Sequence, residues 1–230
     1  MQRRNQKVVE ETPAPGLPAA TRARMLAAAV ALGESVGYQS VGTVEFIYDS
    51  RRDDFYFLEV NTRLQVEHPI TEAVTGIDLV AWMLQIAAGE PPVMASLPVP
   101  QGAAMEVRIY AEDPLRNFQP SPGTLTEVVF PDADWVRVDG WISSGSEVSP
   151  HYDPMLAKLI VHGTDRADAL AKLQQALDAT SLGGIASNLE YLRQITRWQR
   201  FVSGDVATQA LNSFEFAPNA MEVVVAGTYT

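Results

Sequence analysis

The 230-residue sequence contains no cysteine, which excludes disulfides, thiolate zinc sites and a cysteine nucleophile. It also lacks any run of about 18 apolar residues, so no transmembrane helix is predicted. Basic residues are scarce: 17 Lys and Arg against 28 Asp and Glu give a formal net charge of −11. This charge argues against non-specific binding to nucleic acid or to a membrane surface. No apolar region follows the basic start of the chain, so no signal peptide is predicted, and a cytoplasmic location is expected.

Common nucleotide-binding and hydrolase motifs are absent as well. There is no Gly-x-x-x-x-Gly-Lys loop and no Gly-x-Gly-x-x-Gly fingerprint, so neither a Walker-type nor a Rossmann site is supported. The serines at residues 143–146 do not form a nucleophile elbow. The chain is 47% hydrophobic, which is enough to bury the core of one large domain or of two small ones.

The first part of the chain alternates between helix and strand patterns. A helix is predicted from about residue 18 to residue 36, with Thr21 as its N-cap and a buried stripe at Leu26, Val30, Gly33 and Val36. A second helix is predicted at residues 78–88, capped by Asp78. Prolines between residues 91 and 100 mark a linker, and a domain boundary is expected there.

The second part is predicted to contain mostly strands and then helices. Strands are expected at residues 105–110, 124–130, 135–142 and 155–162. In the first of these, alternation places Glu106 and Arg108 on one polar face, opposite the apolar side chains of Met105, Val107 and Ile109.

Helix caps are expected at two later positions. Asp165 would cap the first helix after the strands, with Leu170, Leu173 and Leu177 directed inward. Ser187 begins a Ser-x-x-Glu capping box for the next helix, and a last short helix is expected near Asp205. The predicted fold class is therefore α+β, with mostly antiparallel sheet in the second part.

The most informative stretch is Phe-Tyr-Phe-Leu-Glu-Val-Asn-Thr-Arg-Leu-Gln-Val-Glu-His-Pro at residues 55–69. A second β-rich run at residues 43–48 precedes it, and the short charged segment between them predicts a hairpin. The antiparallel register then places Glu45 directly opposite Glu59, with Cβ atoms roughly 4.5–5.5 Å apart. Because strand side chains alternate between faces, Asn61 lies on the same face as Glu59.

This arrangement predicts a metal site. Two ionised carboxylates at such a distance repel each other unless a cation lies between them. Oxygen ligands select a hard ion, and Mg²⁺ or Mn²⁺ commonly shares its shell with the phosphates of a bound ligand. Either glutamate alone would be an ordinary solvent-facing residue of an exposed hairpin. Both together favour a metal site with the ligands Glu45, Glu59 and Asn61.

The residues after Asn61 suggest the co-substrate. The guanidinium of Arg63 can pair bidentately with carboxylate, bicarbonate or phosphate. Glu67, beside a bound anion and a metal, could act as a general base. The alternative for Arg63 is a surface ion pair, for instance with Glu67, worth under about 1 kcal/mol. His68 is interpreted as a packing or turn residue rather than as a metal ligand.

Taken together, several segments resemble the biotin carboxylases. The resemblance rests on residues 59–72, which begin Glu-Val-Asn-Thr-Arg-Leu-Gln-Val-Glu-His-Pro, and on residues 2–11, 42–46, 106–114, 120–123 and 152–158. It extends almost to Asn212. The sequences of three segments are most similar to the biotin carboxylase component of the urea carboxylases: residues 110–113, 139–141 and 222–230.

The resemblance implies a division of the chain and a reaction. Residues 1–98 would be the C-terminal part of an ATP-grasp domain, residues 99–217 a biotin carboxylase C-terminal domain, and residues 218–230 the start of a following domain. The family's reaction joins bicarbonate to ATP, which gives carboxyphosphate and then CO₂ for carboxylation of biotin. ATP, Mg²⁺ or Mn²⁺, bicarbonate and biotin on a separate carrier domain are therefore expected.

The resemblance also implies roles for individual residues. Glu45, Glu59 and Asn61 would bind the metal and the nucleotide phosphates, and Gln2 and Asn5 would lie near the ribose. Bicarbonate would be held by Lys7, Arg63 and the backbone around Gln65 and Val66. Glu67 would be the base that deprotonates bicarbonate, and Arg108 would stabilise the biotin enolate. Asn5 departs from the family pattern, because many biotin carboxylases have a histidine there.

A second departure concerns what the chain contains. The half of the catalytic unit that carries the first α/β domain and most of the mobile ATP lid is not part of the sequence, so this chain alone is expected to be inactive. Expected partners are that amino-terminal half, the carrier domain, a carboxyltransferase domain and a second copy in a homodimer, with no nucleic acid and no membrane.

The function favoured by the sequence is part of a urea carboxylase, which carboxylates urea to allophanate. One alternative is the biotin carboxylase of an acyl-CoA carboxylase. A second is a non-catalytic module for dimerisation or docking, and a third is an ATP-grasp ligase that acts on another substrate.

Overall fold

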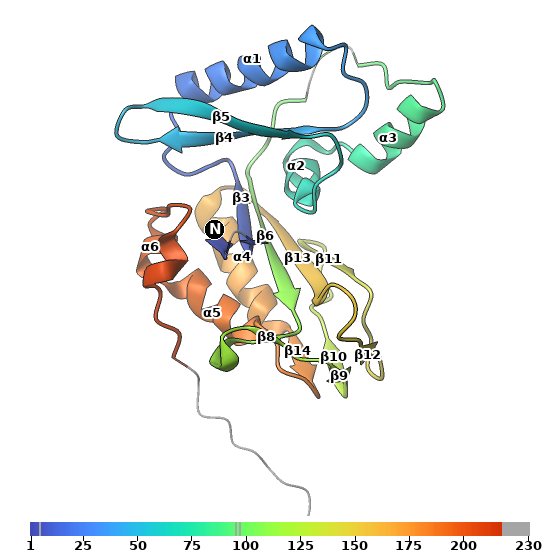
Figure 1. The fold of residues 1–230 in the computed structure, drawn as a ribbon, viewed down its shortest axis with the longest axis vertical. Coiled ribbons are helices and arrows are strands. Elements are labelled where there is room, and N and C mark those ends of the chain that lie inside the picture. The colour runs from blue at the N-terminus through green and yellow to red at the C-terminus, as the bar shows by residue number, and fades with distance from the viewer. Residues whose placement is uncertain (5, 95, 97, 218–230) are drawn as a thin grey trace, which may run out of the picture.

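The computed structural model describes residues 1–4, 6–94, 96 and 98–217. Figure 1 shows a hairpin with helices beside it at one end of the molecule, and a larger body in which helices pack on a sheet. Every strand pair among the described residues is antiparallel. The predicted α+β class is therefore confirmed. The predictions for Asn5 and for residues 218–230 concern parts of the chain outside the described residues.

A four-stranded sheet organises the larger body. Its strand order is β11-β13-β6-β3, with the bounds Val136–Gly140, Met155–Gly163, Ala103–Tyr110 and Val9–Thr12. All eight residues of β6 are buried. The predicted alternation in β6 is present, but its polar face is not exposed: Glu106 is 0% and Arg108 9% exposed. Both faces of the sheet are covered, and this is why strand polarity failed to predict exposure.

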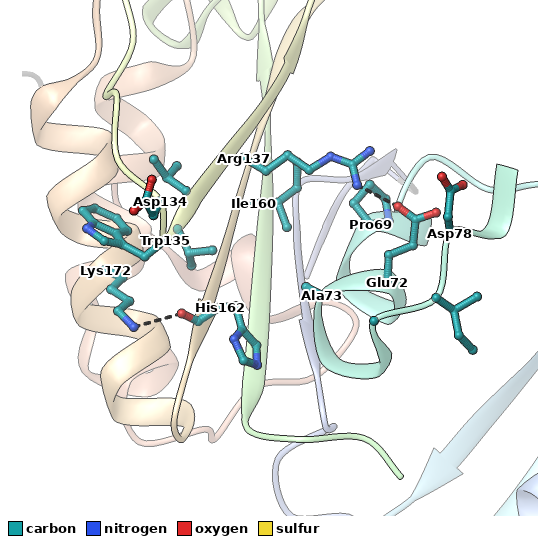
Figure 2. Close-up of a pocket in the computed structure, with 14 residues that line it drawn as sticks. Pro69, Glu72, Ala73, Asp78, Asp134, Trp135, Arg137, Ile160, His162 and Lys172 are labelled. Atoms are coloured by element: carbon teal, nitrogen blue, oxygen red, sulfur yellow. Dashed lines mark hydrogen bonds and ion pairs between the residues drawn. The ribbon is translucent and has the colours of Figure 1, made fainter. Parts of the chain in front are cut away.

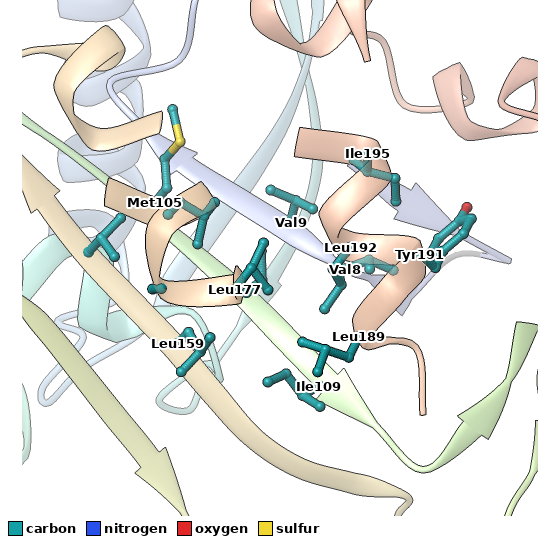
Figure 3. Close-up of a cluster of buried hydrophobic side chains, with 14 of the residues drawn as sticks. Val8, Val9, Met105, Ile109, Leu159, Leu177, Leu189, Tyr191, Leu192 and Ile195 are labelled. Carbon is teal, nitrogen blue, oxygen red and sulfur yellow. The ribbon is translucent and has the colours of Figure 1, made fainter. Parts of the chain in front are cut away.

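Two helices cover the apolar face of the sheet. They are α4, Arg166–Ala179, and α5, Leu189–Arg197. The apolar side chains of β6 and β13 meet them in one cluster, part of which Figure 3 shows. The predicted cap of α4 is confirmed, because the Asp165 side chain accepts a hydrogen bond from the Asp168 backbone N–H at 2.9 Å. Leu170, Leu173 and Leu177 are buried as predicted.

The start of α5 differs from the prediction. Asn188, not Ser187, is the N-cap residue, and no side chain caps the helix. The Asn188 amide instead binds the C-terminal end of β6, accepting from Tyr110 N–H at 2.8 Å and donating to the Arg108 carbonyl at 3.0 Å. The predicted Ser-x-x-Glu box is therefore wrong, because tertiary contacts to the sheet determine how this segment enters the helix.

The hairpin agrees with its predicted register. Strands β4, Thr43–Asp49, and β5, Asp54–Asn61, pair with Glu45 opposite Glu59, and a bulge follows at Glu45 and Phe46. Because side chains alternate along each strand, this register determines the face of the hairpin that carries the carboxylates.

The helix before the hairpin, α1, Ala19–Ser35, forms where it was predicted, but its buried stripe was predicted wrongly. Leu26 is 51% and Val30 58% exposed. Thr21 does not cap the helix; it is buried and donates to Asp53 at 2.7 Å. Among the described residues, no element covers the apolar stripe of α1, so amphipathic spacing alone did not determine burial.

One helix was missed. α2, His68–Thr75, follows the motif at residues 59–67 directly and packs Ile70 and Val74 against Ala104 and Ile160 of the sheet. Pro69 in its first turn is typical of a helix start. The next helix, α3, Leu79–Ala87, is capped by Asp78 as predicted, with Ala81 N–H donating at 2.8 Å.

The remaining elements are short. They are β1 Gln2–Arg3, β2 Gln6–Lys7, β7 Glu112–Asp113, the 3-10 helix Pro114–Arg116, β8 Gln119–Pro120, β9 Gly123–Thr124, β10 Glu127–Val129, β12 Glu147–Val148, β14 Ser181–Gly183, α6 Gln199–Val202 and the 3-10 helix Ala210–Ser213. The helix predicted near Asp205 does not form there; the 3-10 helix begins at Ala210. In the described part of the chain no single helix is long and apolar enough to cross a membrane, and only the bent pair of α2 and α3 passes that test together.

Candidate active site

The hairpin presents two carboxylates and an amide at its end. Asn61 donates from its side-chain amide to Glu45 at 3.2 Å and to Glu59 at 3.1 Å. The predicted metal ligands therefore lie together, bridged by the amide. Their side-chain oxygens are the donors that Mg²⁺ prefers. Within the described ranges, no three His, Cys, Asp or Glu side chains form a cluster that could hold a metal ion. A cation here would therefore complete its shell with ligand oxygens.

Glu45 collects further donors from outside the hairpin. Gln65 donates its side-chain amide at 2.8 Å, and Lys7 donates its ammonium at 3.2 Å. The Gln65 hydrogen bond is the largest influence on the pKa of Glu45, and with Lys7 it holds that pKa below the ordinary value despite partial burial. Glu45 is thus an anion at neutral pH, as a metal ligand requires.

Glu67 lies at the start of α2 between two cations. Lys7 donates to one of its carboxylate oxygens, and Arg108 donates to the other at 2.8 Å. Burial acts to raise the pKa of Glu67. The hydrogen bonds from Lys7 and from the Glu67 backbone N–H, together with the charges of Lys7 and Arg108, outweigh that effect, so the pKa is lowered. The carboxylate is therefore ionised and can accept a proton.

Arg108 reaches this site from the middle of the sheet. It forms an ion pair with Glu10 at 2.5 Å and another with Glu67 at 2.8 Å. Burial is the main cause of a raised pKa at Glu10, and the charge of Arg108 opposes it. The three side chains come from β3, β6 and the residue before α2, so the sheet connects the two parts of the molecule at this point.

Lys7 connects the two groups of carboxylates. Its ammonium bonds to Glu45 and Glu67 and lies 3.4 Å from the side-chain oxygen of Gln65. Burial acts to lower the pKa of Lys7, but the two glutamates outweigh it and the pKa is raised. Lys7 therefore stays charged and joins the predicted metal ligands to the predicted base.

The other predicted residues are less constrained. Arg63 is exposed, and its guanidinium donates to the Leu64 carbonyl at 3.3 Å. The ion pair with Glu67 that was considered for Arg63 does not form, because Glu67 binds Lys7 and Arg108. Gln2 pairs with Lys7 across β1 and β2. The ring Nδ1 of His68 donates to the Gln65 carbonyl at 2.8 Å, which fits its interpretation as a turn residue.

The structure adds two residues that the sequence motifs did not single out. Glu10 binds Arg108, and Lys158 of β13 donates to the Val66 carbonyl at 2.8 Å. Both are charged side chains on largely buried strands, where exposure is 9% or less. For Lys158, the signal was an isolated charge within an apolar strand; Glu10, which is followed by Glu11 in a short strand, has no such signal.

A cleft of about 640 Å³ lies elsewhere, between α2, β11 and α4. Figure 2 shows Arg137 reaching Glu72 on one side of it and Lys172 bonded to His162 on the other. None of the predicted site residues lines this cleft. The candidate site is therefore a polar surface where the hairpin meets the sheet, and it is defined by its hydrogen bonds.

Comparisons with protein-family models divide the chain into two matches. The ATP binding domain of the carbamoyl-phosphate synthase L chain matches residues 1–93, and the biotin carboxylase C-terminal domain matches residues 106–213. The chain is 55% identical to the urea amidolyase of Saccharomyces cerevisiae, covering 100% of its own length but 12% of that protein.

Solved structures agree with these matches. The urea carboxylase of Kluyveromyces lactis is 57% identical with a TM-score of 0.92, over 94% of this chain and 19% of that one. The biotin carboxylase domain of a thermophilic 2-oxoglutarate carboxylase, bound to bicarbonate, is 38% identical with a TM-score of 0.90, over 94% of this chain and 50% of that one. The two family matches follow one another along the chain, as part of an ATP-grasp domain and then a biotin carboxylase C-terminal domain. The chain therefore belongs to the biotin carboxylase family.

Proposed function

We propose that this chain provides the bicarbonate-activating surface of an ATP-dependent biotin carboxylase within a urea carboxylase. The observation that carries the proposal is the Glu67 carboxylate held between Lys7 and Arg108. A carboxylate that is ionised yet surrounded by cations can take a proton from a bound acid while the cations retain the resulting anion. A relative of this fold has been solved with bicarbonate bound, which supports the same co-substrate here.

Lys7 and Arg63 would hold the bicarbonate oxygens, together with the backbone of Gln65 and Val66. The exposed Arg63 guanidinium is free of any carboxylate partner among the described residues, so its planar donors are available for a bidentate contact. Glu67 would accept the proton of the bicarbonate hydroxyl, and the oxygen thereby made nucleophilic would attack the γ-phosphate of ATP. The products of this step are ADP and carboxyphosphate.

Glu45, Glu59 and Asn61 would hold Mg²⁺, which, when bound, offsets the negative charge of the nucleotide phosphates. The related 2-oxoglutarate carboxylase domain of Hydrogenobacter thermophilus has been solved with MgADP and bicarbonate, at 37% identity and a TM-score of 0.90. Gln2 and Asn5 would lie on the ribose side. Arg108, already ionised and directed at Glu67, would stabilise the enolate of biotin presented on its carrier domain.

The proposed base is tested by Glu67→Gln in the full-length enzyme. Glutamine keeps the volume and one acceptor oxygen for Lys7 or Arg108, but it cannot accept a proton. Bicarbonate-dependent ADP formation should fall by about 100-fold or more, with little change in the KM for ATP. Glu127→Gln, on a strand far from the site, is the matched control. A Glu67→Gln enzyme with wild-type turnover would reject the proposed role.

A second candidate is the biotin carboxylase of an acyl-CoA carboxylase. It is favoured by 46% identity to the propionyl-CoA carboxylase alpha chain of Caenorhabditis elegans and 49% to the methylcrotonoyl-CoA carboxylase alpha subunit of Mus musculus. Urea carboxylase is preferred because that similarity is higher and covers the entire chain. Assaying the full-length enzyme for bicarbonate-dependent ADP formation with urea, propionyl-CoA or methylcrotonoyl-CoA distinguishes the two candidates.

The partners in this function follow from the lengths compared. The chain spans about half of the solved biotin carboxylase domains, so the first α/β domain and ATP lid, a biotin carrier and a carboxyltransferase would complete the catalytic unit. A homodimer and a cytoplasmic location remain predictions. Because positioning and exclusion of water supply much of phosphoryl transfer, the chain by itself should not turn over ATP. Bicarbonate-dependent ADP release by the purified chain would contradict this.

A further inference from the structure

A buried lysine lies beneath the loop that carries Glu67. Lys158 is 7% exposed, and its ammonium donates to the Val66 carbonyl at 2.8 Å. Its nearest carboxylate is Asp139, at 3.4 Å. Asp139 is also bound by Arg137 through two hydrogen bonds of 2.7 and 2.9 Å. The shortest contact of the buried Lys158 ammonium is therefore with a peptide carbonyl. Burying an ammonium whose closest partner is a neutral carbonyl costs free energy, which indicates that the charge has a role at this carbonyl.

The position of Lys158 in the sheet makes this contact more informative. Lys158 pairs directly with Arg108 across β13 and β6, and like charges at such positions repel. Each of the two cations binds a successive residue of the same loop, Lys158 at Val66 and Arg108 at Glu67. A row of charged side chains on the sheet thus holds the base and the residue before it.

The contact acts on a particular peptide group. The Val66 carbonyl and the Glu67 N–H belong to one peptide, so the contact from Lys158 holds the backbone from which the Glu67 side chain extends. We propose that Lys158 is a positioning residue for Glu67: it fixes the Val66–Glu67 peptide and thereby holds the Glu67 carboxylate where it meets Lys7 and Arg108.

The inference rests on the proposed function only in naming bicarbonate as the acid on which Glu67 acts. The peptide contact itself can be tested in the isolated chain. The charged groups around Glu67 that a titration must take into account are Lys7, Glu10, Glu45, Glu106 and Arg108. They stay unchanged in every variant used below.

The experiment is a carboxyl-carbon NMR titration of Glu67 in the purified chain. Lys158→Met keeps an unbranched side chain that is one atom shorter and removes the donor, so the pKa of Glu67 should rise by about 0.5 to 1 unit. Lys158→Arg keeps a cationic donor, so the pKa of Glu67 should stay close to its wild-type value. The matched control is Lys172→Met, because Lys172 also binds a carbonyl, that of His162 at 3.0 Å, and a carboxylate, Asp168 at 2.9 Å. Lys172→Met should leave the pKa of Glu67 unchanged.

A folded Lys158→Met chain with the wild-type Glu67 titration would overturn the inference. If that variant does not fold, the wild-type chain decides: the Lys158 ammonium should show a scalar correlation to the Val66 carbonyl carbon across the hydrogen bond. The lack of such a correlation would also overturn it.

A second arm separates this inference from the proposed function. In the full-length enzyme, Lys158→Met should raise the KM for bicarbonate by about tenfold, leave the KM for ATP unchanged and move the acidic limb of the pH profile upward. If Lys158→Met raises the pKa of Glu67 in the isolated chain but leaves the KM for bicarbonate of the full-length enzyme unchanged, the positioning contact is supported and the proposed function is rejected.

Discussion

The guanidinium of Arg108 lies 2.8 Å from the carboxylate of Glu67, although 41 positions separate them in the chain. On its other side Arg108 pairs with Glu10. One cation thus compensates two carboxylates at the junction of the sheet with the start of α2. Together with the hydrogen bond and charge of Lys7, which lower the pKa of Glu67 more, the pairing keeps the proposed base ionised in a half-buried place. It also makes Arg108 a structural residue as well as a functional one.

Arg108→Ala should therefore destabilise the chain strongly. It would leave Glu10 and Glu67 close together without their shared cation, and breaking buried ion pairs costs about 3–5 kcal/mol. The double variant Arg108→Ala, Glu10→Gln should recover part of the loss because it removes one uncompensated charge. Urea unfolding of the three proteins measures the effect. Equal stabilities of the single and double variants would contradict the shared-cation interpretation.

Asn188→Ala should cost about 2–3 kcal/mol in the free energy of unfolding. The amide satisfies a backbone N–H and a backbone carbonyl of β6, and its loss would leave both groups buried without partners. Ser187→Ala is the matched control and should cost well under about 1 kcal/mol, because Asn188 is the N-cap residue. Both costs are measured by denaturant unfolding. If Ser187→Ala cost more than Asn188→Ala, the predicted capping box at Ser187 would be supported instead.

Glu106 should make stability depend on pH. Burial is the main cause that raises its pKa from 4.5 to about 8, opposed by the charge of Lys158. The folded chain thus keeps a proton that the unfolded chain releases above pH 4.5. Stability is fully present below that value and falls as the pH rises, by on the order of 1.4 kcal/mol per pH unit at most, until it levels off above about pH 8.

Glu106→Gln removes this titration without changing the volume. The variant should gain stability relative to the wild type as the pH increases from 5 to 8. The surrounding charges are Glu10 from β3, Arg108 from β6, Lys158 from β13 and Glu67 before α2, and they are common to both proteins. Urea unfolding at several pH values measures the difference. A constant difference between pH 5 and pH 8 would show that Glu106 is already ionised in the folded chain.

Glu59→Gln should weaken binding of the magnesium nucleotide in the full-length enzyme by about tenfold, because a carboxylate ligand is replaced by a neutral amide. Calorimetric titration with MgADP measures it. The control titration uses ADP with excess chelator, for which the variant and the wild type should bind alike. If Glu59→Gln weakened the binding of MgADP and of ADP with chelator equally, Glu59 would contact the nucleotide rather than the metal.

Local patterns carried a large part of the prediction. The pairing of Glu45 with Glu59 depends on residues 43–61 alone, although it needs a one-residue bulge at Glu45 and Phe46 in addition to the turn. The caps at Asp78 and Asp165 depend on groups within three residues of each aspartate. These features are determined before any long-range contact forms.

Long-range contacts decided the rest. The stripe of α1 has helical spacing, yet Leu26 and Val30 are exposed because spacing says which residues share a face and not what covers that face. Ser187 has a capping-box sequence, but the bonds from Asn188 to β6 determine the start of α5. At α1 no described element packs on the predicted stripe, whereas at α5 tertiary contacts prevailed over a weaker local preference.

The sequence by itself determined the chemistry at the end of the hairpin, because Glu59 and Asn61 lie on one face of one strand and Glu45 is brought opposite within the same hairpin, by a turn and a one-residue bulge. Only the tertiary structure decided how Glu67 is held. Arg108 and Lys158 reach it from two neighbouring strands of the sheet, and 92 positions separate Lys158 from the Val66 carbonyl that it binds. Pairing between β6 and β13 puts both cations beneath one loop, and no local pattern in the chain specifies that pairing.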